Sequence, residues 1–285
     1  MELEILGSWA GSPGPKSACS GYLISEGDTQ LLFDCGPGVV PQLQVNHDPS
    51  KIDAIFISHM HADHSMDLLT YAYRLIRFSW RGLAPDQIRP IPLYLPPGGL
   101  QVLAHLVAAF GRPDSGRLAD PFQAAFIPAE LIDGKTIAVG SLIVTPYEVM
   151  HAVPAFAYRV QGAASSFAYS GDTKLCPGLK RASQGVDMLL SEATSLENDP
   201  RMITVAGHLT AGQAGEVAAE AGTGCLVLTH FPRQDQQWLL DVVHQAHVAF
   251  RGKVISALTG LKSLVPEVPS ATGLHRGNHQ YRGVV

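Results

Sequence analysis

Short apolar runs bounded by glycine, proline or polar residues recur along most of this chain. Runs of this length with such flanks are typical of β-strands. Helical patterns lie between only some of them, so two packed sheets flanked by helices fit better than one doubly wound sheet. The expected strands are residues 3–6, 21–25, 30–34, 54–58, 141–149, 166–170, 187–191, 225–229 and 253–257. The expected helices are residues 64–76, 98–110, 211–221 and 235–248.

Length and composition indicate a globular protein. The chain has 285 residues, of which 46% are hydrophobic and 16% charged, which is typical of a compact fold and not of a disordered chain. The Pro/Gly-rich stretch from Arg81 to Gly99 is interpreted as a loop, too short to separate two domains. We expect one domain over residues 1–265. We expect an extended or disordered tail over residues 266–285, where apolar periodicity ends.

The cysteines and the N-terminal segment favour a cytoplasmic protein. The four cysteines are far apart and form no Cys-x-x-Cys pair, so neither a disulfide framework nor a thiolate zinc site is expected. The first residues lack the basic segment and apolar run of a secretory signal. No stretch approaches the roughly 18 uninterrupted apolar residues of a membrane span, so no membrane partner is expected.

The charge disfavours a long nucleic-acid groove. The formal net charge is −5, which provides no electrostatic footprint for an extended polyanion, although a local basic patch could bind a single phosphate. Extended nucleic-acid binding is therefore not expected. The sequence leaves the oligomeric state open, a homodimer included.

A dense cluster of potential metal ligands follows the apolar run at residues 54–57. The segment 58–64 reads Ser-His-Met-His-Ala-Asp-His and precedes a helical pattern. A strand that ends abruptly before a helix points consecutive side chains into a crevice at its carboxyl end. Imidazole and carboxylate groups suit zinc, with manganese or iron as alternatives. His59 and His61 could chelate one ion, which leaves Asp63 and His64 for a second.

Three further candidate ligands each lie just past a predicted strand. His151 follows the run 141–149, Asp172 follows 166–170 and His230 follows 225–229. One such residue by itself would more often be structural. Three of them at the same edge as the histidine cluster predict a site.

The order of these residues resembles the metallo-β-lactamase superfamily, whose pattern is His-x-His-x-Asp-His, a later His, a Gly-Asp and a final His. The resemblance implies an α/β fold, a four-layer αββα sandwich with two metal ions, expected to be Zn²⁺, at the sheet edges. It also implies three ligand sets: His59, His61 and His151 for the first ion, Asp63, His64 and His230 for the second, and Asp172 between the two. Asp63 is counted among the catalytic residues as well.

Three segments narrow the resemblance to the ribonuclease Z and phosphodiesterase branch. The opening is glycine-rich, residues 191–194 resemble that branch's His-Glu-Ala-Thr motif, and residues 207–210 resemble its Gly-His-Ser-Thr. The Leu-Thr-His-Phe segment at 228–231 fits as well. Ser191 and Leu209 depart from these motifs, whereas Glu192 and His208 match.

The residues that match predict hydrolysis of a phosphodiester. Two cations can share and activate a water molecule. A phosphodiester also needs a proton on its departing alkoxide, and His208, outside the ligand set, is the expected donor. Glu192 would hold the His208 imidazole in one tautomer.

Three alternatives stay open. A lactone or thioester hydrolase of the same superfamily would need less acid assistance from His208 and Glu192. A metal-stabilised scaffold without turnover would be expected to have lost ligands. Processing of the 3′ end of transfer RNA is less expected, because such enzymes usually carry a long arm between the ligands that match His151 and Asp172. Here 20 residues intervene, and they are interpreted as a hairpin that leaves no room for an arm. A small-molecule phosphodiester, cyclic or linear, is therefore the expected substrate.

Other polar residues are weaker candidates. Asp34 could support a ligand histidine through a hydrogen bond, or could simply form a turn. Arg233 is the better anion binder among the arginines. Arginines that could meet a phosphate or form a solvated face are Arg74, Arg77 and Arg81. Histidines expected to be structural or exposed are His244, His247, His275 and His279.

Overall fold

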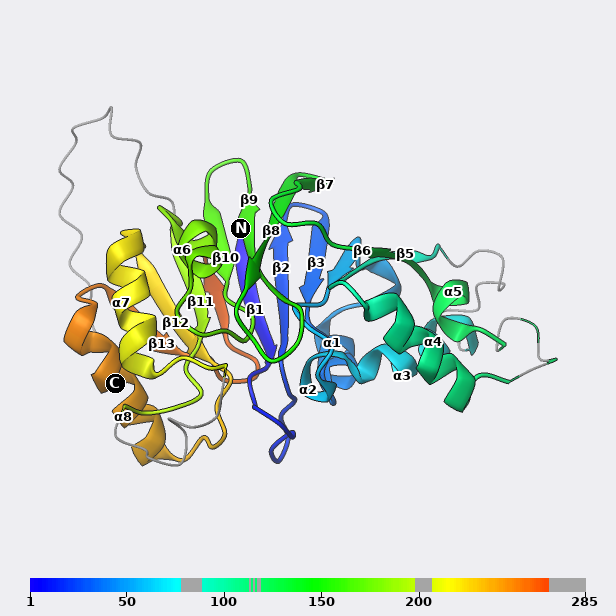
Figure 1. Cartoon of the computed structure of the whole chain (residues 1–285), viewed down its shortest axis with the longest axis horizontal. Coiled ribbons are helices and arrows are strands. Elements are labelled where there is room, and N and C mark those ends of the chain that lie inside the picture. Colours follow the sequence, from blue (N-terminus) through cyan, green and yellow to red (C-terminus); the bar gives the residue numbers. More distant parts are fainter. Residues whose placement is uncertain (78–88, 113, 115, 117–118, 198–206, 267–285) are drawn as a thin grey trace.

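Two β-sheets pack face to face, with helices on both outer sides (Figure 1). The computed structural model describes residues 1–77, 89–112, 114, 116, 119–197 and 207–266. Within these residues each sheet has seven strands. The first sheet contains β1 (Glu2–Gly7), β2 (Gly21–Glu26), β3 (Thr29–Phe33), β4 (Ala54–Phe56), β5 (Ile91–Leu95), β6 (Phe126–Glu130) and β14 (Lys262–Leu264). The second contains β7 (Ile137–Val139), β8 (Leu142–Val149), β9 (Ala155–Gln161), β10 (Ser166–Tyr169), β11 (Met188–Glu192), β12 (Cys225–Thr229) and β13 (Lys253–Ser256).

Each sheet is parallel in one half and antiparallel in the other. The first has the order β14-β1-β2-β3-β4-β5-β6, and its strands from β3 to β6 are parallel. The second has the order β13-β12-β11-β10-β9-β8-β7, and its strands from β10 to β13 are parallel. Because β8 and β10 are both antiparallel to β9, they run in the same direction as each other. The carboxyl ends of β8, β10, β11 and β12 therefore lie at one edge.

The helices form the two outer layers. Figure 1 shows α6, α7 and α8 beside the second sheet, and α1 to α5 on the opposite side of the molecule. Helices on the side of the first sheet are α1 (Val39–Asn46), α2 (Ala62–Ser65), α3 (Asp67–Arg77), α4 (Gly99–Phe110) and α5 (Pro121–Ala125), with a 3₁₀ turn at Pro49–Lys51. Those beside the second sheet are α6 (Pro177–Ser183), α7 (Ala211–Ala221) and α8 (Gln236–Ala249).

Three hydrophobic clusters correspond to the three interfaces between the four layers. The middle cluster lies between the sheets and is rich in aromatic rings: Phe33 stacks on Phe56 with ring centroids 5.2 Å apart, and Tyr158 contacts both. Burial of such large apolar side chains is the dominant favourable term in folding. The predicted four-layer αββα sandwich is confirmed.

The expected strands and helices are present, with shifts of a few residues at their ends. The expected helix at 64–76 is divided at Met66 into α2 and α3. The hairpin between His151 and Asp172 is confirmed, because β9 and β10 pair antiparallel with only residues 162–165 between them.

The interpretation of Arg81–Gly99 as a loop is wrong for its second half, since residues 91–95 form the parallel strand β5. Ile91, Leu93 and Leu95 are buried in alternation with Pro92 and Tyr94. Proline normally argues against a strand because it has no N–H group for the ladder. For this reason Pro92 led to the prediction of a loop here. Residues 81–88 lie outside the described residues. Elements without a predicted counterpart are α1, α5, α6, β6, β7 and β14.

No helix among the described residues is long and apolar enough to cross a membrane. The expected tail at 266–285 lies outside the described residues apart from Pro266, and the single domain over residues 1–265 stays a prediction.

Candidate metal centre

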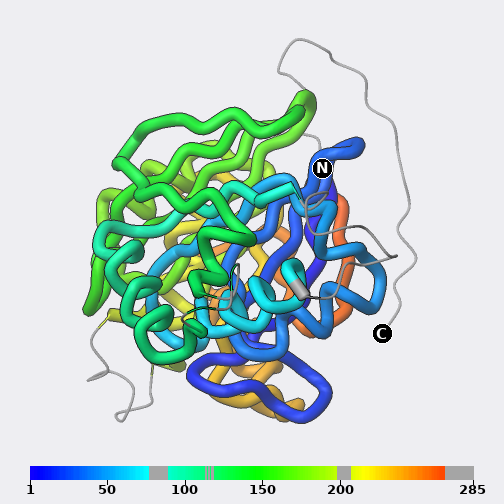
Figure 2. The backbone as a smooth tube through the Cα atoms, turned by 90° about the vertical axis from the view of Figure 1, so that its right-hand side faces the viewer, coloured from blue at the N-terminus to red at the C-terminus, as the bar shows by residue number. Residues whose placement is uncertain are grey.

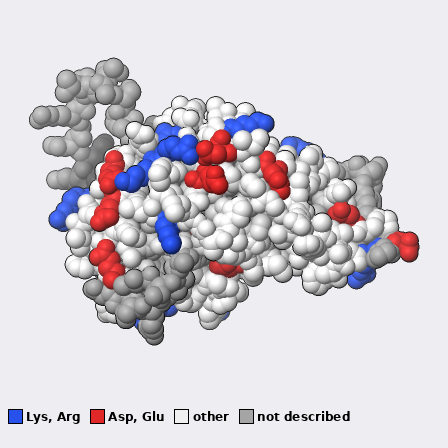
Figure 3. Space-filling model, in the orientation of Figure 1, with Lys and Arg blue, Asp and Glu red and all other residues white. Residues whose placement is uncertain are grey.

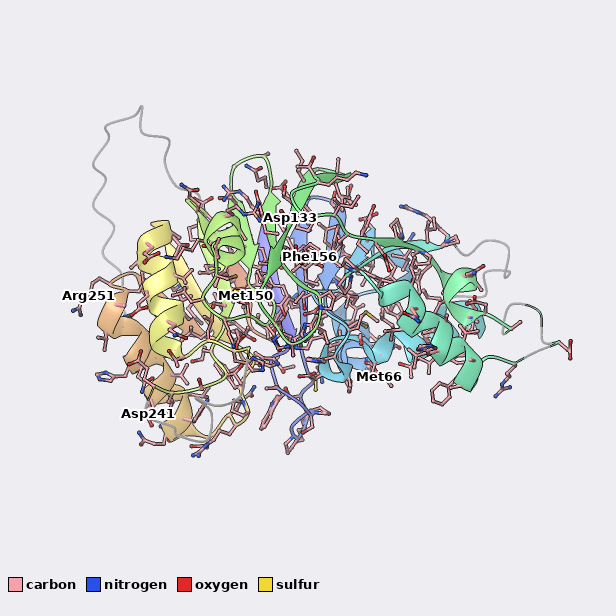
Figure 4. All side chains as sticks on the ribbon, in the orientation of Figure 1. Met66, Asp133, Met150, Phe156, Asp241 and Arg251 are labelled. Carbon is pink, nitrogen blue, oxygen red and sulfur yellow. The ribbon has the colours of Figure 1, made fainter. Side chains whose placement is uncertain are left out.

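The ends of strands from both sheets converge at one edge of the sandwich. This edge lies at the lower end of the molecule in Figures 1 and 2, where the dark blue loop after β1 is also found. Figure 4 labels two residues near this edge. Met150 directly precedes His151, and Met66 directly follows Ser65, the last residue of α2. Side chains that follow strand ends here are Asp34 after β3, His59 after β4, His151 after β8, Asp172 after β10 and His230 after β12.

Backbone hydrogen bonds hold the segment after β4 against the second sheet. The amide of Phe156, which Figure 4 labels in β9, donates to the Ser58 carbonyl at 2.9 Å. The chain then turns at His61, which directly precedes α2, so that His64 lies within this short helix. The cluster therefore spans an extended segment and the following turn, as its sequence predicts.

Three histidines form the first group of converging donor atoms. His61 Nδ1 lies 3.0 Å from His59 Nε2 and 3.2 Å from His151 Nε2. Two nitrogens bound to one tetrahedral zinc ion at about 2.0–2.1 Å lie roughly 3.3 Å apart. The spacing of these nitrogens therefore matches a shared cation. His59 and His61 come from the first sheet and His151 from the second, so the group bridges the two.

A second group lies beside the first. His230 Nε2 is 3.2 Å from both Asp63 Oδ2 and His64 Nε2, and the latter two atoms are 3.7 Å apart. The Gly11 amide donates to Asp63 Oδ2 at 2.7 Å and so ties the loop after β1 to this group.

Asp172 lies between the two groups. Its Oδ2 is 3.6 Å from His59 Nε2 in the first group and 3.4 Å from both His64 Nε2 and His230 Nε2 in the second. Its Oδ1 is buried without any hydrogen-bond partner. A buried carboxylate oxygen is normally satisfied, so this atom indicates a missing partner such as a cation.

Most of the imidazoles have a hydrogen bond at the nitrogen that faces away from the site. His64 Nδ1 donates to Asp34 Oδ2 at 2.7 Å, and His151 Nδ1 donates to the Gly207 carbonyl at 2.9 Å. His59 Nδ1 lies 3.1 Å from the Ser58 hydroxyl, which itself donates to Asp34. Such partners fix the tautomer and leave the other nitrogen free to bind a metal.

Two residues of the site have a strained backbone. Asp34 has φ 59° and His230 has φ 61°, a left-handed conformation that is uncommon for residues other than glycine. Each directly follows the strand that carries it, so the chain changes direction there. Strained residues of this kind cluster at functional sites.

The ionisation of His59, His61 and Asp172 favours a bound cation. Burial, and next the neighbouring His64, hold the pKa of His59 well below its usual range, and burial with His151 lowers the pKa of His61. Burial opposes ionisation of Asp172, but His230 and His64 hold the pKa of its carboxyl well below the usual range. His64 is the exception: burial opposes its protonation, but Asp172 and Asp34 outweigh this and raise its pKa, so a bound cation would have to displace a proton from His64. Neutral imidazoles and ionised carboxylates are the forms that coordinate metals.

The donor set therefore fits two divalent cations. All seven predicted ligands lie together in the structure, in overlapping groups whose donor atoms are within 4.8 Å of one another. Their role as ligands stays a prediction.

His208 and Glu192 form a pair next to these groups. His208 Nδ1 is 3.1 Å from both carboxylate oxygens of Glu192, which is fully buried at the end of β11. Burial opposes protonation of His208, but the charge and hydrogen bond of Glu192 outweigh it and raise the pKa of His208 to about 9. The His208 ring stacks on that of His230 with centroids 5.4 Å apart. The pair is thus in contact with the second group.

The weaker candidates divide in the structure. Asp34 has the expected turn conformation, and its carboxylate accepts from His64, Ser58 and Tyr169. Its support of a metal ligand stays a prediction. Arg233 pairs with Asp235 and lies over the Trp238 ring. His244 is exposed on α8. Residues that lie wholly outside the described residues are Arg81, His275 and His279.

Sequence reasoning missed several residues that support the site. Ser58 and Thr194 stand out in the sequence only as parts of motifs, and the amide of Gly11 and the carbonyl of Gly207 have no side-chain signature. Gly207 has φ 120°, and a Cβ there would lie 2.6 Å from His151 Nδ1. Only glycine therefore fits at the position that holds His151.

Comparison with known proteins agrees with this architecture. A family model described as the beta-lactamase superfamily domain matches residues 29–231. An uncharacterized protein of Mycobacterium tuberculosis is 34% identical over 259 residues, covering 89% of this chain and 88% of the relative. Ribonuclease Z of Nocardia farcinica is 30% identical over 311 residues, covering 90% of this chain and 95% of the relative.

A solved structure has the same fold. The metallo-beta-lactamase fold protein YhfI of Bacillus subtilis superposes with a TM-score of 0.78 at 25% identity, covering 92% of this chain and 98% of that one. The family model alone spans more than half of the chain, and the relatives cover nearly all of it. On this combination of fold, histidine cluster and sequence similarity, the chain is a member of the metallo-hydrolases of the beta-lactamase superfamily.

Proposed function

We propose that this protein is a binuclear metal-dependent phosphodiesterase that acts on a small or nucleotide phosphodiester. The observation that carries the proposal is the His208–Glu192 pair beside the converging histidines. A hydrolase that releases a poor leaving group needs a proton donor as well as a nucleophile. A lactone or thioester hydrolase has less need of such a pair.

Two groups of side chains would hold the ions. His59, His61 and His151 would bind the first, Asp63, His64 and His230 the second, and Asp172 would contact both. Zinc suits these nitrogen and oxygen donors, and Mn²⁺ or Fe²⁺ are alternatives. Bound divalent cations would supply an activated water and would stabilise charge on the phosphoryl oxygens.

His208 would protonate the oxygen of the leaving alcohol. Its Nδ1–H group is bound to the Glu192 carboxylate, so Nε2 is the nitrogen available to a substrate. The buried negative charge of Glu192 stabilises the imidazolium form before the proton is transferred. Glu192 itself contacts the backbone amide of Thr173 at 2.7 Å, which keeps the carboxylate in place.

A small substrate is favoured over precursor transfer RNA. The hairpin of β9 and β10 occupies the place where a long arm would be inserted. On the face drawn in Figure 3, the lysine and arginine side chains of the described residues are scattered among acidic ones. Such a face lacks the continuous basic stripe that binds extended polyanions. The similarity to a ribonuclease Z supports phosphodiester chemistry. Precursor transfer RNA is therefore the most important alternative substrate to test.

A substrate panel tests the proposal. The metal-loaded protein is assayed with bis-p-nitrophenyl phosphate, cyclic and linear nucleotide diesters, an acyl lactone, a thioester, a β-lactam and a precursor transfer RNA. We expect turnover of the diesters and none of the β-lactam. The same panel is run with His208→Ala, which removes the proposed proton donor. His244→Ala, which removes an exposed histidine of α8, is its matched control.

Each other outcome has a definite meaning. Lactone or thioester turnover without diester turnover would replace the proposal by its rival. Processing of precursor transfer RNA as fast as the small diesters would overturn the preference for small substrates. A fully metal-loaded protein without activity on any of them would favour the binding scaffold.

A further inference from the structure

The Thr194 hydroxyl lies between a buried carboxylate and a candidate metal ligand. Thr194 follows β11 by two residues and is only 4% exposed. Its Oγ1 is 2.6 Å from Glu192 Oε2 and 2.8 Å from His230 Nδ1. The proposed phosphodiesterase function assigns no role to this side chain.

The direction of these two hydrogen bonds follows from the groups involved. An ionised carboxylate only accepts, so the single hydroxyl proton of Thr194 goes to Glu192. The oxygen of Thr194 is then an acceptor for His230, and His230 must carry its proton on Nδ1. Its Nε2 is left with a free lone pair, 3.2 Å from Asp63 Oδ2 and His64 Nε2.

Glu192 therefore supports two histidines with different tasks. It binds the Nδ1 of His208 directly at 3.1 Å and the Nδ1 of His230 through Thr194. The two rings are nearly parallel, with 19° between their planes. Glu192 is fully buried, so no water competes for its oxygens.

We propose that Thr194 is a positioning residue that fixes the tautomer and orientation of His230 and thereby sets the affinity of the second metal site. The proposal rests on the ligand assignment of the proposed function, but not on the identity of the substrate. It also makes Glu192 a support of metal binding in addition to proton transfer.

The first metal site has supports of its own. His59 is held by Ser58 and His151 by the Gly207 carbonyl, and neither contact involves Thr194. Removal of the Thr194 hydroxyl should therefore weaken one site and spare the other. A general loss of stability would affect both.

The test compares variants at Thr194 with a matched control. Thr194→Val removes the hydroxyl and keeps the shape, whereas Thr194→Ser keeps the hydroxyl. Thr229→Val is the control, because Thr229 is a buried neighbour of His230 in sequence whose hydroxyl lies 2.9 Å from that of Tyr22. Zinc affinity is measured for each full-length protein by competition with a chromophoric chelator, and stoichiometry by elemental analysis.

We expect Thr194→Val to bind its second zinc ion about 10- to 100-fold more weakly, the usual effect of losing a hydrogen-bond partner behind a ligand histidine. The first zinc ion should bind as in the wild type. Thr194→Ser should restore the second affinity, and Thr229→Val should leave both affinities unchanged.

The proposal would be overturned if Thr194→Val bound both zinc ions with wild-type affinity. It would also be overturned if a folded Thr194→Val lost affinity equally at both sites. If the valine variant does not fold, Thr194→Ala removes the same hydroxyl without adding a methyl group, and the same comparison applies. The measurement does not depend on turnover. Failure of the phosphodiesterase assignment would leave its outcome unaffected.

Discussion

At the scale of single residues, the imidazole nitrogen that faces away from the site decides whether a histidine can bind a metal. A histidine can bind a metal through one nitrogen only if the other nitrogen carries the proton, and a hydrogen-bond acceptor behind the ring decides which one does. Asp34 performs this task for His64 and Thr194 performs it for His230. His208 has such an acceptor in Glu192 but lies outside both groups of predicted ligands, which suits a proton donor.

Replacement of His208 should separate proton transfer from metal binding. His208→Ala should keep both metals, because the seven predicted ligands do not include it. Its rate on a diester with a poor alkoxide leaving group should fall by about 10²–10⁴, the usual contribution of a general acid. An acidic nitrophenol leaves without help, so the loss on a nitrophenyl diester should be much smaller.

Single-turnover rates on both substrates, with metal content measured alongside, are the appropriate measurement, because slow product release would mask the chemical step. Equal losses on both leaving groups with metals intact would show that His208 binds or orients the phosphoryl group instead.

At the scale of elements, close backbone contacts bring the strand ends together. A Cβ at Gly36, just after β3, would lie 1.9 Å from the carbonyl oxygen of Asp63, so a side chain there would displace the second group of ligands. Elsewhere in the first sheet, Glu4 in the middle of β1 joins three elements. It bonds Lys262 of β14 at 2.9 Å and His47, just after α1, at 2.7 Å.

Glu4 should stabilise the fold in a pH-dependent manner. Burial opposes its ionisation, but the bonds to Lys262 and His47 outweigh this and lower the pKa of Glu4 from its usual range. A lowered carboxyl pKa means that the stabilisation is complete above the unfolded-state value and is lost as the pH falls through the folded-state value. Glu4→Gln should therefore reduce the free energy of unfolding by about 1–3 kcal/mol at pH 7.

The difference between wild type and Glu4→Gln should shrink as the pH falls below about 4, since both side chains are then neutral. Urea unfolding at both pH values provides the comparison, with Glu2→Gln on the same strand as the control. An equal difference at both pH values would contradict the role of the Glu4 charge.

At the scale of the whole molecule, the site lies where the two sheets meet. His59, His61, Asp63 and His64 follow a strand of the first sheet, whereas His151, Asp172 and His230 follow strands of the second. Cations held by both sets would link the two halves of the sandwich. Metal binding and stability should then be coupled, because a ligand that binds only the folded state stabilises it.

The purified protein should contain close to two zinc or similar ions per chain, and their removal should lower its melting temperature. A free zinc concentration of about 1,000 times the dissociation constant adds about 4 kcal/mol to the free energy of unfolding for each site. Elemental analysis and calorimetry before and after chelation, with zinc restored as the control, measure both quantities. A protein without bound metal even after supplementation would rule out the binuclear site.

The resemblance of the sequence motifs to a known superfamily implied the four-layer fold. The sequence by itself also determined most of the strands and the candidate ligands. This was possible because alternation, turn residues and the position of a histidine just after a strand are local properties of the chain. His59, His151 and Asp172 could be assigned to one edge from their positions after predicted strands alone. Strand β5 was missed because Pro92 within it, and Pro90 and Pro96 on either side, outweighed its alternation. Strands β6, β7 and β14 were not predicted either.

Only the tertiary structure decided which atoms support the site. The Gly11 amide reaches Asp63, the Gly207 carbonyl reaches His151, and Thr194 reaches His230, each across a long stretch of chain. Two of these contacts involve backbone groups, which carry no pattern in the sequence, and the motif that contains Thr194 does not show which residue its hydroxyl reaches. Their direction depends on how the two sheets pack, and this packing places partners behind the rings of His59, His64, His151 and His230.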